Sequence, residues 1–284
     1  MLEAPIDERV AVYHTLRPTM HADRRDSGAD RQSDGQPSPH RAADWVGEAV
    51  FNGHIALWSW PTADVRRVLA PGLEPVAPPF GPVVATGHHP VIFVHGEQTR
   101  GTNFFAGIPF HSGLAYNEGG IFVPFIRHRG GGLLSTAVPA MYADFFPPVW
   151  HGEAHYGYGK QLVAFRDEGP VRLCLSTDGR VLLELMVEPR GPWRLASTAA
   201  QGLVEFFARA TSLPIVGWTS EGTLIGSSFH WDFERAQVRP ADSLVQLRAG
   251  LIGGTNRSCA DVPAGTIEVR GMHWKLSWPR RCAG

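Results

Sequence analysis

Short runs of β-branched and aromatic residues, bounded by glycine or proline, limit how this chain can fold. They include Val91–Val94, Ile121–Phe125 and Pro214–Trp218. Runs of this kind are typical of β-strands. One pair of runs, Val171–Ser176 and Val181–Val187, is joined through Asp178-Gly179, a dipeptide that favours a tight hairpin turn. Most of the chain is therefore predicted to form antiparallel β-sheet.

Helices are predicted at two places. Thr62–Ala70 begins with a threonine that could cap its first turn, and Pro71-Gly72 follows as a stop signal. In Thr198–Ala210 the large apolar residues recur on one helical face. Thr266–Arg270 and Trp274–Trp278 are predicted as two late strands. The fold class is therefore α+β, a mainly antiparallel sheet with a few helices.

One polar segment divides the chain. Residues His21–Ala43 are charged or polar and contain almost no large apolar side chains. Such a segment cannot bury enough surface to offset the entropy lost on ordering. Residues 1–44 are therefore predicted to be a largely disordered extension, and residues 45–284 a single β-rich domain.

Composition excludes several classes of function. The formal net charge is −1, so no nucleic-acid or anionic-membrane surface is expected. No apolar run is long enough to span a membrane. The three cysteines have no metal-type spacing, and the acidic first residues do not form a secretory leader. We expect a cytoplasmic protein without a resident metal.

Lys160 is the first candidate for chemistry. It and Lys275 are the only lysines among 26 basic residues. Lys160 follows Gly157-Tyr158-Gly159, where the glycines allow a ligand to approach the backbone closely, and it precedes an apolar run. On local sequence alone, the ordinary interpretation is a lysine at a strand end whose stem lies on apolar side chains.

Two further groups could carry chemistry. Glu118, in Tyr116-Asn117-Glu118-Gly119-Gly120, could be a general acid or base, although a solvated turn residue is the ordinary alternative. His151, Glu153 and His155 alternate, so on a strand all three would project to one face and could hold a metal.

Four segments taken in order resemble the acetoacetate decarboxylase-like superfamily. They are Val65–Pro75, Tyr116-Asn117-Glu118, Met141-Tyr142-Ala143-Asp144 and Gly157-Tyr158-Gly159-Lys160. The resemblance implies a barrel-like sheet, a homo-oligomer and a lysine that forms an imine with a small oxo acid. Lys160 matches that lysine, and Glu118 matches an active-site carboxylate. Tyr116, Tyr158, His155 and Gln161 are candidates for binding the substrate. No cofactor is implied, because the lysine itself forms the imine.

This chain departs from the family pattern at Gln161, where the decarboxylases carry a second lysine. An amine attacks a carbonyl only in its neutral form, which desolvation or a nearby cation favours. Acetoacetate decarboxylase is itself a known case of a lysine activated by a neighbouring cation. Without that second lysine, apolar neighbours must desolvate Lys160, or Arg127 or Arg129 must supply the charge. The protonated imine could then serve decarboxylation or aldol and dehydration chemistry.

Two other functions remain open. The chain could bind a small carbonyl or aromatic ligand without converting it. It could also be a metal-dependent β-barrel enzyme that uses His151, Glu153 and His155.

Overall fold

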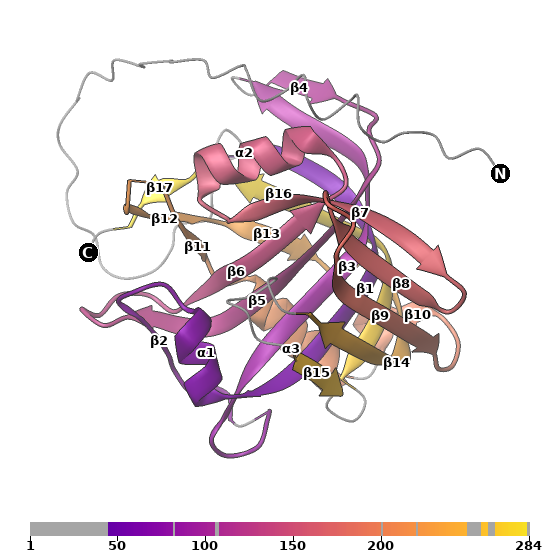
Figure 1. Cartoon of the computed structure of the whole chain (residues 1–284), viewed down its shortest axis with the longest axis horizontal. Coiled ribbons are helices and arrows are strands. Elements are labelled where there is room, and N and C mark those ends of the chain that lie inside the picture. The colour runs from indigo at the N-terminus through magenta and orange to yellow at the C-terminus, as the bar shows by residue number, and fades with distance from the viewer. Residues whose placement is uncertain are drawn as a thin grey trace. The chain divides into compact units, whose positions relative to one another are not determined.

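The structure is a computed structural model that describes residues 45–81, 83–105, 108–199, 201–219, 221–248, 257–260 and 265–282. The disordered extension predicted for residues 1–44 lies outside the described residues. The described part is dominated by strands, as the sequence predicts, and belongs to the α+β class (Figure 1).

The strands of the first half are β1 (Trp45–Pro61), β2 (Leu73–Pro75), β3 (His88–Phe105), β4 (Ile108–His111), β5 (Tyr116–His128), β6 (Ser135–Ala143), β7 (Lys160–Glu168), β8 (Val171–Ser176) and β9 (Val181–Pro189). Those of the second half are β10 (Arg194–Leu195), β11 (Ile215–Trp218), β12 (Leu224–Ser227), β13 (Phe229–Asp232), β14 (Gln237–Leu247), β15 (Arg257–Ala260), β16 (Thr266–Ser277) and β17 (Arg280–Arg281). The helices are α1 (Thr62–Val68), α2 (Phe146–Tyr156) and α3 (Gln201–Thr211), and a 3-10 turn, η3 (Ala196–Thr198), precedes α3.

The predicted hairpin is confirmed, because β8 and β9 pair antiparallel across the turn at Asp178-Gly179. Two other predictions need correction. Helix α1 has Pro61 at its N-cap and no side-chain cap, because the chain enters it directly from the extended end of β1. The two late strands are one strand, β16. Gly271, at φ 67°, lies where β16 carries one extra residue against β1, so a bulge bends the strand without ending it.

The strand pairings close on themselves. The ring closes because β16 pairs with β1. The order of neighbouring strands around it is β1, β3, β5, β6, β7, β8, β9, β14 and β16. All of these pairs are antiparallel except β6 with β7. Closure leaves no free sheet edge along this ring, which matches the barrel-like sheet that the resemblance implies.

Two apolar cores lie on opposite faces of this sheet. Along β1, Trp58 and Trp60 belong to one core, whereas Ile55 and Leu57 belong to the other, as strand alternation requires. The first core takes residues from β1, β3, β5, β6, β7, β8, β9 and β14, so it fills the interior of the ring. The second core packs α3 and strand β13 against the outer face. Both faces of the sheet are therefore covered.

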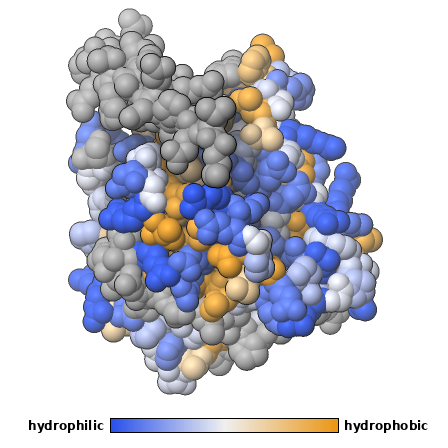
Figure 2. All heavy atoms as spheres, turned by 45° about the vertical axis from the view of Figure 1, so that its right-hand side comes forward, coloured by the Kyte–Doolittle hydropathy of each residue, from blue (hydrophilic) through white to orange (hydrophobic). Residues whose placement is uncertain are grey.

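No helix among the described residues is long and apolar enough to cross a membrane. On the face shown in Figure 2, polar side chains predominate and apolar ones form patches between them.

Buried histidines link the stability of the sheet to pH. Burial lowers the pKa of His54 and of His89, and burial together with the Arg172 guanidinium lowers the pKa of His95 to about 3. These side chains are therefore neutral in the folded protein at neutral pH. The Nε2 atom of His89 bonds the carbonyl oxygen of Pro124 at 2.8 Å.

We expect the free energy of unfolding to fall as the pH drops from about 6.5 toward 3. Over that range the unfolded chain takes up a proton at His95, and the folded chain does not. The slope from one such group approaches about 1.4 kcal/mol per pH unit. Urea denaturation at a series of pH values between 7.5 and 4 measures this dependence of the free energy of unfolding on pH. His95→Gln should reduce the slope, and His230→Gln, at an exposed site, should leave it unchanged. Equal slopes in all three proteins would contradict this account.

Candidate active site

The connection between β6 and β7 builds one wall of a site. These strands are parallel, so the chain must cross back over the sheet, and α2 makes that crossing (Figure 1). Helix α2 has proline in its first turn and ends at Gly157, which adopts the left-handed conformation at φ 61°. The N–H groups of Gly157 and Tyr158 both donate to the carbonyl of Gly152.

Strand register brings polar side chains from β3, β5 and β7 to the face that α2 covers. Gln98 lies opposite Tyr116, and Gly96 lies opposite Glu118. Lys160 is the first residue of β7 and pairs with Met141 in β6. Because alternate residues of a strand share a face, Tyr116, Glu118 and Lys160 project to the same side of the sheet.

Lys160 and Glu118 form a buried ion pair. The Nζ atom of Lys160 donates to Oε2 of Glu118 at 2.8 Å, and the two side chains are only 7% and 12% exposed. Tyr116 also hydrogen-bonds Glu118. Burial and the Glu118 carboxylate raise the pKa of Tyr116 well above its ordinary value, so its hydroxyl stays protonated and donates.

The stem of Lys160 is held against α2 and the turn that follows it. A Cβ atom added at Gly152 would lie 3.1 Å from Cδ of Lys160, so the glycine provides the room for the lysine stem. The buried Tyr158 side chain bonds Oγ of Ser227 at 2.5 Å. Burial raises the pKa of the Tyr158 hydroxyl above its ordinary value. Lys160 is therefore fixed by packing as well as by its carboxylate partner.

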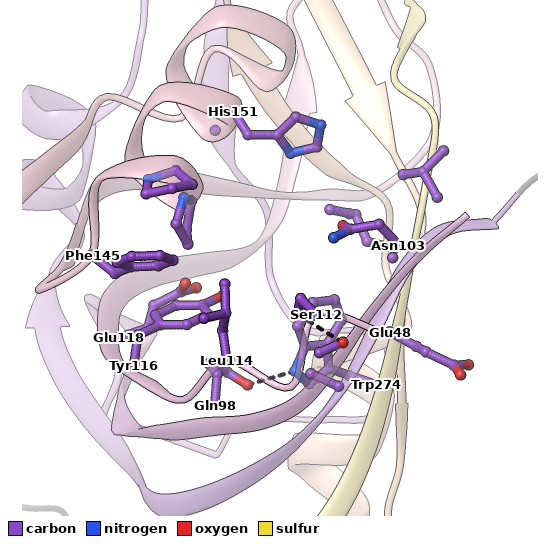
Figure 3. A pocket seen from close by; sticks show the side chains of 18 of the residues that line it. Glu48, Gln98, Asn103, Ser112, Leu114, Tyr116, Glu118, Phe145, His151 and Trp274 are labelled. Carbon is purple, nitrogen blue, oxygen red and sulfur yellow. Dashed lines mark hydrogen bonds between the residues drawn. The ribbon is translucent and has the colours of Figure 1, made fainter. Parts of the chain in front are cut away.

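The pair opens onto a cavity of about 510 Å³ between the sheet and α2. Figure 3 shows Gln98, Tyr116 and Glu118 side by side on its floor, with His151 projecting from α2. Burial, the neighbouring His155 and the charge of Lys160 lower the pKa of His151 to about 4. Its imidazole is therefore neutral at neutral pH and offers the cavity one hydrogen-bond donor and one acceptor. His151 was expected only as a metal ligand.

The structure brings most of the predicted site residues together. Lys160, Glu118, Tyr116, Tyr158 and His155 all line this cavity. Gln161 does not: its side chain is exposed and lies on the other face of β7 from Lys160, outside the lining of the cavity.

The metal-site alternative required His151, Glu153 and His155 to lie on a strand, but all three residues lie in helix α2. On a helix, His151 and His155 are four residues apart and share a face, with ring centroids 5.1 Å apart, whereas Glu153 projects elsewhere and is exposed. No group of three or more His, Cys, Asp or Glu side chains suited to a metal occurs in the described part of the chain. Two signals of helix α2 were overlooked in the sequence: the pair of prolines at its start and the glycine that follows its end.

Arg127 and Arg129 do not supply a charge to Lys160. Arg127 is nine residues along β5 from Glu118, about 30 Å in an extended strand, and pairs with Glu74 in β2. Both arginines are exposed. Residues of one extended strand lie about 3.3 Å apart for each step along the chain, so Arg127 is remote from the Glu118 end of β5.

Gln98 and Trp274 were missed by the sequence reasoning. The indole N–H of Trp274 donates to Oε1 of Gln98 at 2.6 Å, the contact drawn in Figure 3. An indole can only donate, so the amide oxygen of Gln98 must face it and the NH₂ group points away. No motif marks either residue, since β3 and β16 meet this site only through the closed sheet.

Comparison with solved structures gives the fold. Acetoacetate decarboxylase from Legionella pneumophila subsp. pneumophila str. Philadelphia 1 superposes with a TM-score of 0.53 at 14% identity, covering 90% of this chain and 98% of that one. An acetoacetate decarboxylase-like enzyme from Sphingomonas wittichii RW1 gives 0.53 at 11% identity, over 84% and 93% of the two chains. The enduracididine biosynthesis enzyme MppR gives 0.50 at 14% identity, over 83% and 88%. This chain has the acetoacetate decarboxylase-like fold. No protein-family model matches its sequence, and no curated protein matches it.

Within this acetoacetate decarboxylase-like fold, three of the resembling segments meet at the site. Tyr116-Asn117-Glu118 begins β5, Met141–Asp144 ends β6, and Gly157–Lys160 leads into β7. The Asp144 carboxylate accepts hydrogen bonds from the backbone N–H and the side-chain amide of Asn117, at 2.8 and 2.7 Å. The three segments therefore form one structural unit, in which the neighbouring ends of β5, β6 and β7 surround Lys160.

We expect Gly157→Ala to destabilise the protein by about 2 kcal/mol or more, because residue 157 has a positive φ and its added Cβ would overlap the Trp218 backbone. Thermal or urea unfolding measures the loss. Gly159→Ala is the matched control in the same turn, since nothing lies within 4 Å of the added Cβ. Equal effects of the two substitutions would show that the turn does not need the left-handed residue.

Proposed function

We propose that this chain is a Schiff-base-forming lyase that acts on an oxo acid through Lys160. The observation that carries the proposal is the ion pair between Lys160 and Glu118 at 2.8 Å, at the wall of a cavity of about 510 Å³. A buried lysine with a carboxylate that can serve as its base, facing a ligand-sized cavity, is an arrangement suited to nucleophilic catalysis, although the ionised carboxylate by itself stabilises the ammonium form. The solved structures of the same fold include acetoacetate decarboxylases, which supports enzyme status.

The proposed chemistry divides the work between two side chains. Glu118 accepts a proton from the Lys160 ammonium, and the neutral amine attacks the substrate carbonyl carbon. Loss of water from the carbinolamine leaves a protonated imine, with a new C=N bond in place of C=O. This iminium draws electrons from a breaking bond to a carboxylate, or from an α C–H bond whose proton passes to a base.

Neutral donors are available for the rest of the oxo acid. The hydroxyl of Tyr116 and the amide of Gln98 line the same cavity as the nucleophile. A neighbour of the same fold, MppR, is described in complex with the condensation product of pyruvate and imidazole 4-carboxaldehyde. That complex supports aldol addition with dehydration for this chain, and the acetoacetate decarboxylases of the same fold support decarboxylation.

A non-catalytic binder of the same fold is the second candidate. The apolar lining of the cavity would serve such a protein equally well. It predicts saturable binding of a carbonyl compound that survives loss of the Lys160 amine. An imine-forming enzyme instead loses its covalent adduct when that amine is removed.

Borohydride trapping tests the Schiff base directly. We expect incubation with acetoacetate or pyruvate, followed by borohydride, to leave a stable adduct on Lys160. The chain has only two lysines, so peptide mass spectrometry assigns the site without ambiguity. Lys160→Ala should abolish the adduct and Lys275→Ala, at an exposed site, should retain it. An adduct that is absent with folded wild-type protein, or that survives in Lys160→Ala, would overturn the proposal.

The role of Glu118 is testable by an isosteric change. We expect Glu118→Gln to lower kcat by about 100-fold or more, because an amide keeps the hydrogen bond to Lys160 but cannot take up its proton. The loss of kcat is measured by steady-state turnover of a compound that forms the borohydride-trapped adduct in the wild-type protein. Glu153→Gln, on the exposed side of α2, is the matched control and should retain wild-type kcat. Unchanged turnover in Glu118→Gln would exclude Glu118 as the proton carrier.

A further inference from the structure

The cavity is much larger than a small oxo acid. Such a molecule has about seven non-hydrogen atoms, and even at the ~30 Å³ that a water molecule occupies in the liquid it takes up about 200 Å³. The cavity encloses about 510 Å³. Cavities of this size accommodate ligands with several times as many atoms. More than half of the space beside Lys160 is therefore left for another part of the substrate.

Aromatic side chains line much of the cavity. Besides Phe104, Tyr116 and Tyr158, they are Phe145, Trp150, Phe229, Trp274 and Trp278. Trp150 and Trp278 are 49% and 50% exposed, and both lie on this one cavity. Large apolar side chains that remain half exposed around a concavity mark a ligand site rather than a packing defect.

These aromatic side chains contact other rings in the wall of the cavity. The rings of Trp150 and Trp278 both meet His155 edge to face, with centroids 5.4 and 6.5 Å away. Trp274 stacks on Phe229 at 5.1 Å and is also fixed by its bond to Gln98. Flat faces held in this way favour a flat, apolar guest, and little side-chain entropy is lost when it binds.

Cationic side chains are scarce in the wall of the cavity, and the acidic ones are Glu48 and Glu118. Among the described residues that line it, Lys160 is the only lysine or arginine, and Glu118 already neutralises it. A substrate that filled the aromatic part with a second anionic group would lack a fixed cation there. The far part of the substrate is therefore expected to carry no anionic group.

We propose that the carbonyl substrate of Lys160 carries an aryl group, which lies against Trp150, Trp274 and Trp278 while its carbonyl carbon reaches the amine. The inference rests on the proposed function and names the substrate class: an aryl-substituted oxo acid. The aromatic face selects the substrate body, and Lys160 with Glu118 performs the reaction. Burying one phenyl ring in such a site is worth about tenfold or more in affinity.

A matched pair of compounds tests the proposal. 4-Phenyl-2-oxobutanoate and 2-oxobutanoate differ only by the phenyl group. We expect borohydride trapping at Lys160 of the wild-type protein to reach half its maximum at a concentration about tenfold or more lower for the aryl compound. Trp150→Ala and Trp278→Ala should each lower that ratio several-fold. Leu133→Ala, which removes another exposed apolar side chain but one outside the cavity lining, should keep it.

The outcomes separate the two proposals. Equal half-maximal concentrations for the two compounds would refute the aryl site and leave the Schiff base intact. If neither compound forms an adduct, but the aryl compound alone quenches tryptophan fluorescence in wild type and Lys160→Ala, the aryl site stands and the Schiff base falls. Neither adduct nor quenching would refute both.

Discussion

The parallel pairing of β6 with β7 is the constraint on which the site depends. Every other neighbouring pair in the closed sheet is antiparallel and can be joined without crossing it, but this one needs a crossover, which α2 provides. The crossover covers the outer face of the sheet at the strand ends where Glu118 and Lys160 lie. Closure of the ring fills the inner face with the first core, so the reactive pair faces the space under α2.

The ion pair in that space is better explained by chemistry than by stability. Removing two charges from water costs several kcal/mol for each ion, which their attraction offsets only partly. A pair of apolar side chains of the same volume would serve the fold at least as well. The chain instead keeps a lysine, although arginine supplies nearly all of its other basic side chains. Arginine cannot give up its proton at physiological pH, whereas lysine can, and only the neutral amine attacks a carbonyl.

Local signals predicted the parts of the fold that depend on neighbouring residues. The hairpin of β8 and β9 and helices α1 and α3 follow from turn residues, stop signals and the spacing of apolar residues. The alternation of histidines in α2 suggested a shared face only because a spacing of two residues fits a strand. The prolines at the start of this segment and the glycine after its end indicate a helix instead. Gln98 and Trp274 were missed because they are 176 residues apart and meet only through strand pairing.

The sequence by itself determined the fold class, and it marked Lys160 and Glu118 through four short segments in order. It could do so because those segments resemble, in the same order, the segments of a known family. The tertiary structure alone decided that the lysine and the carboxylate are 2.8 Å apart, and that Arg127, at the far end of β5, is remote from them. It also placed the tryptophans at one cavity. Such contacts depend on register and closure of the sheet, which bring together residues without any local pattern in common.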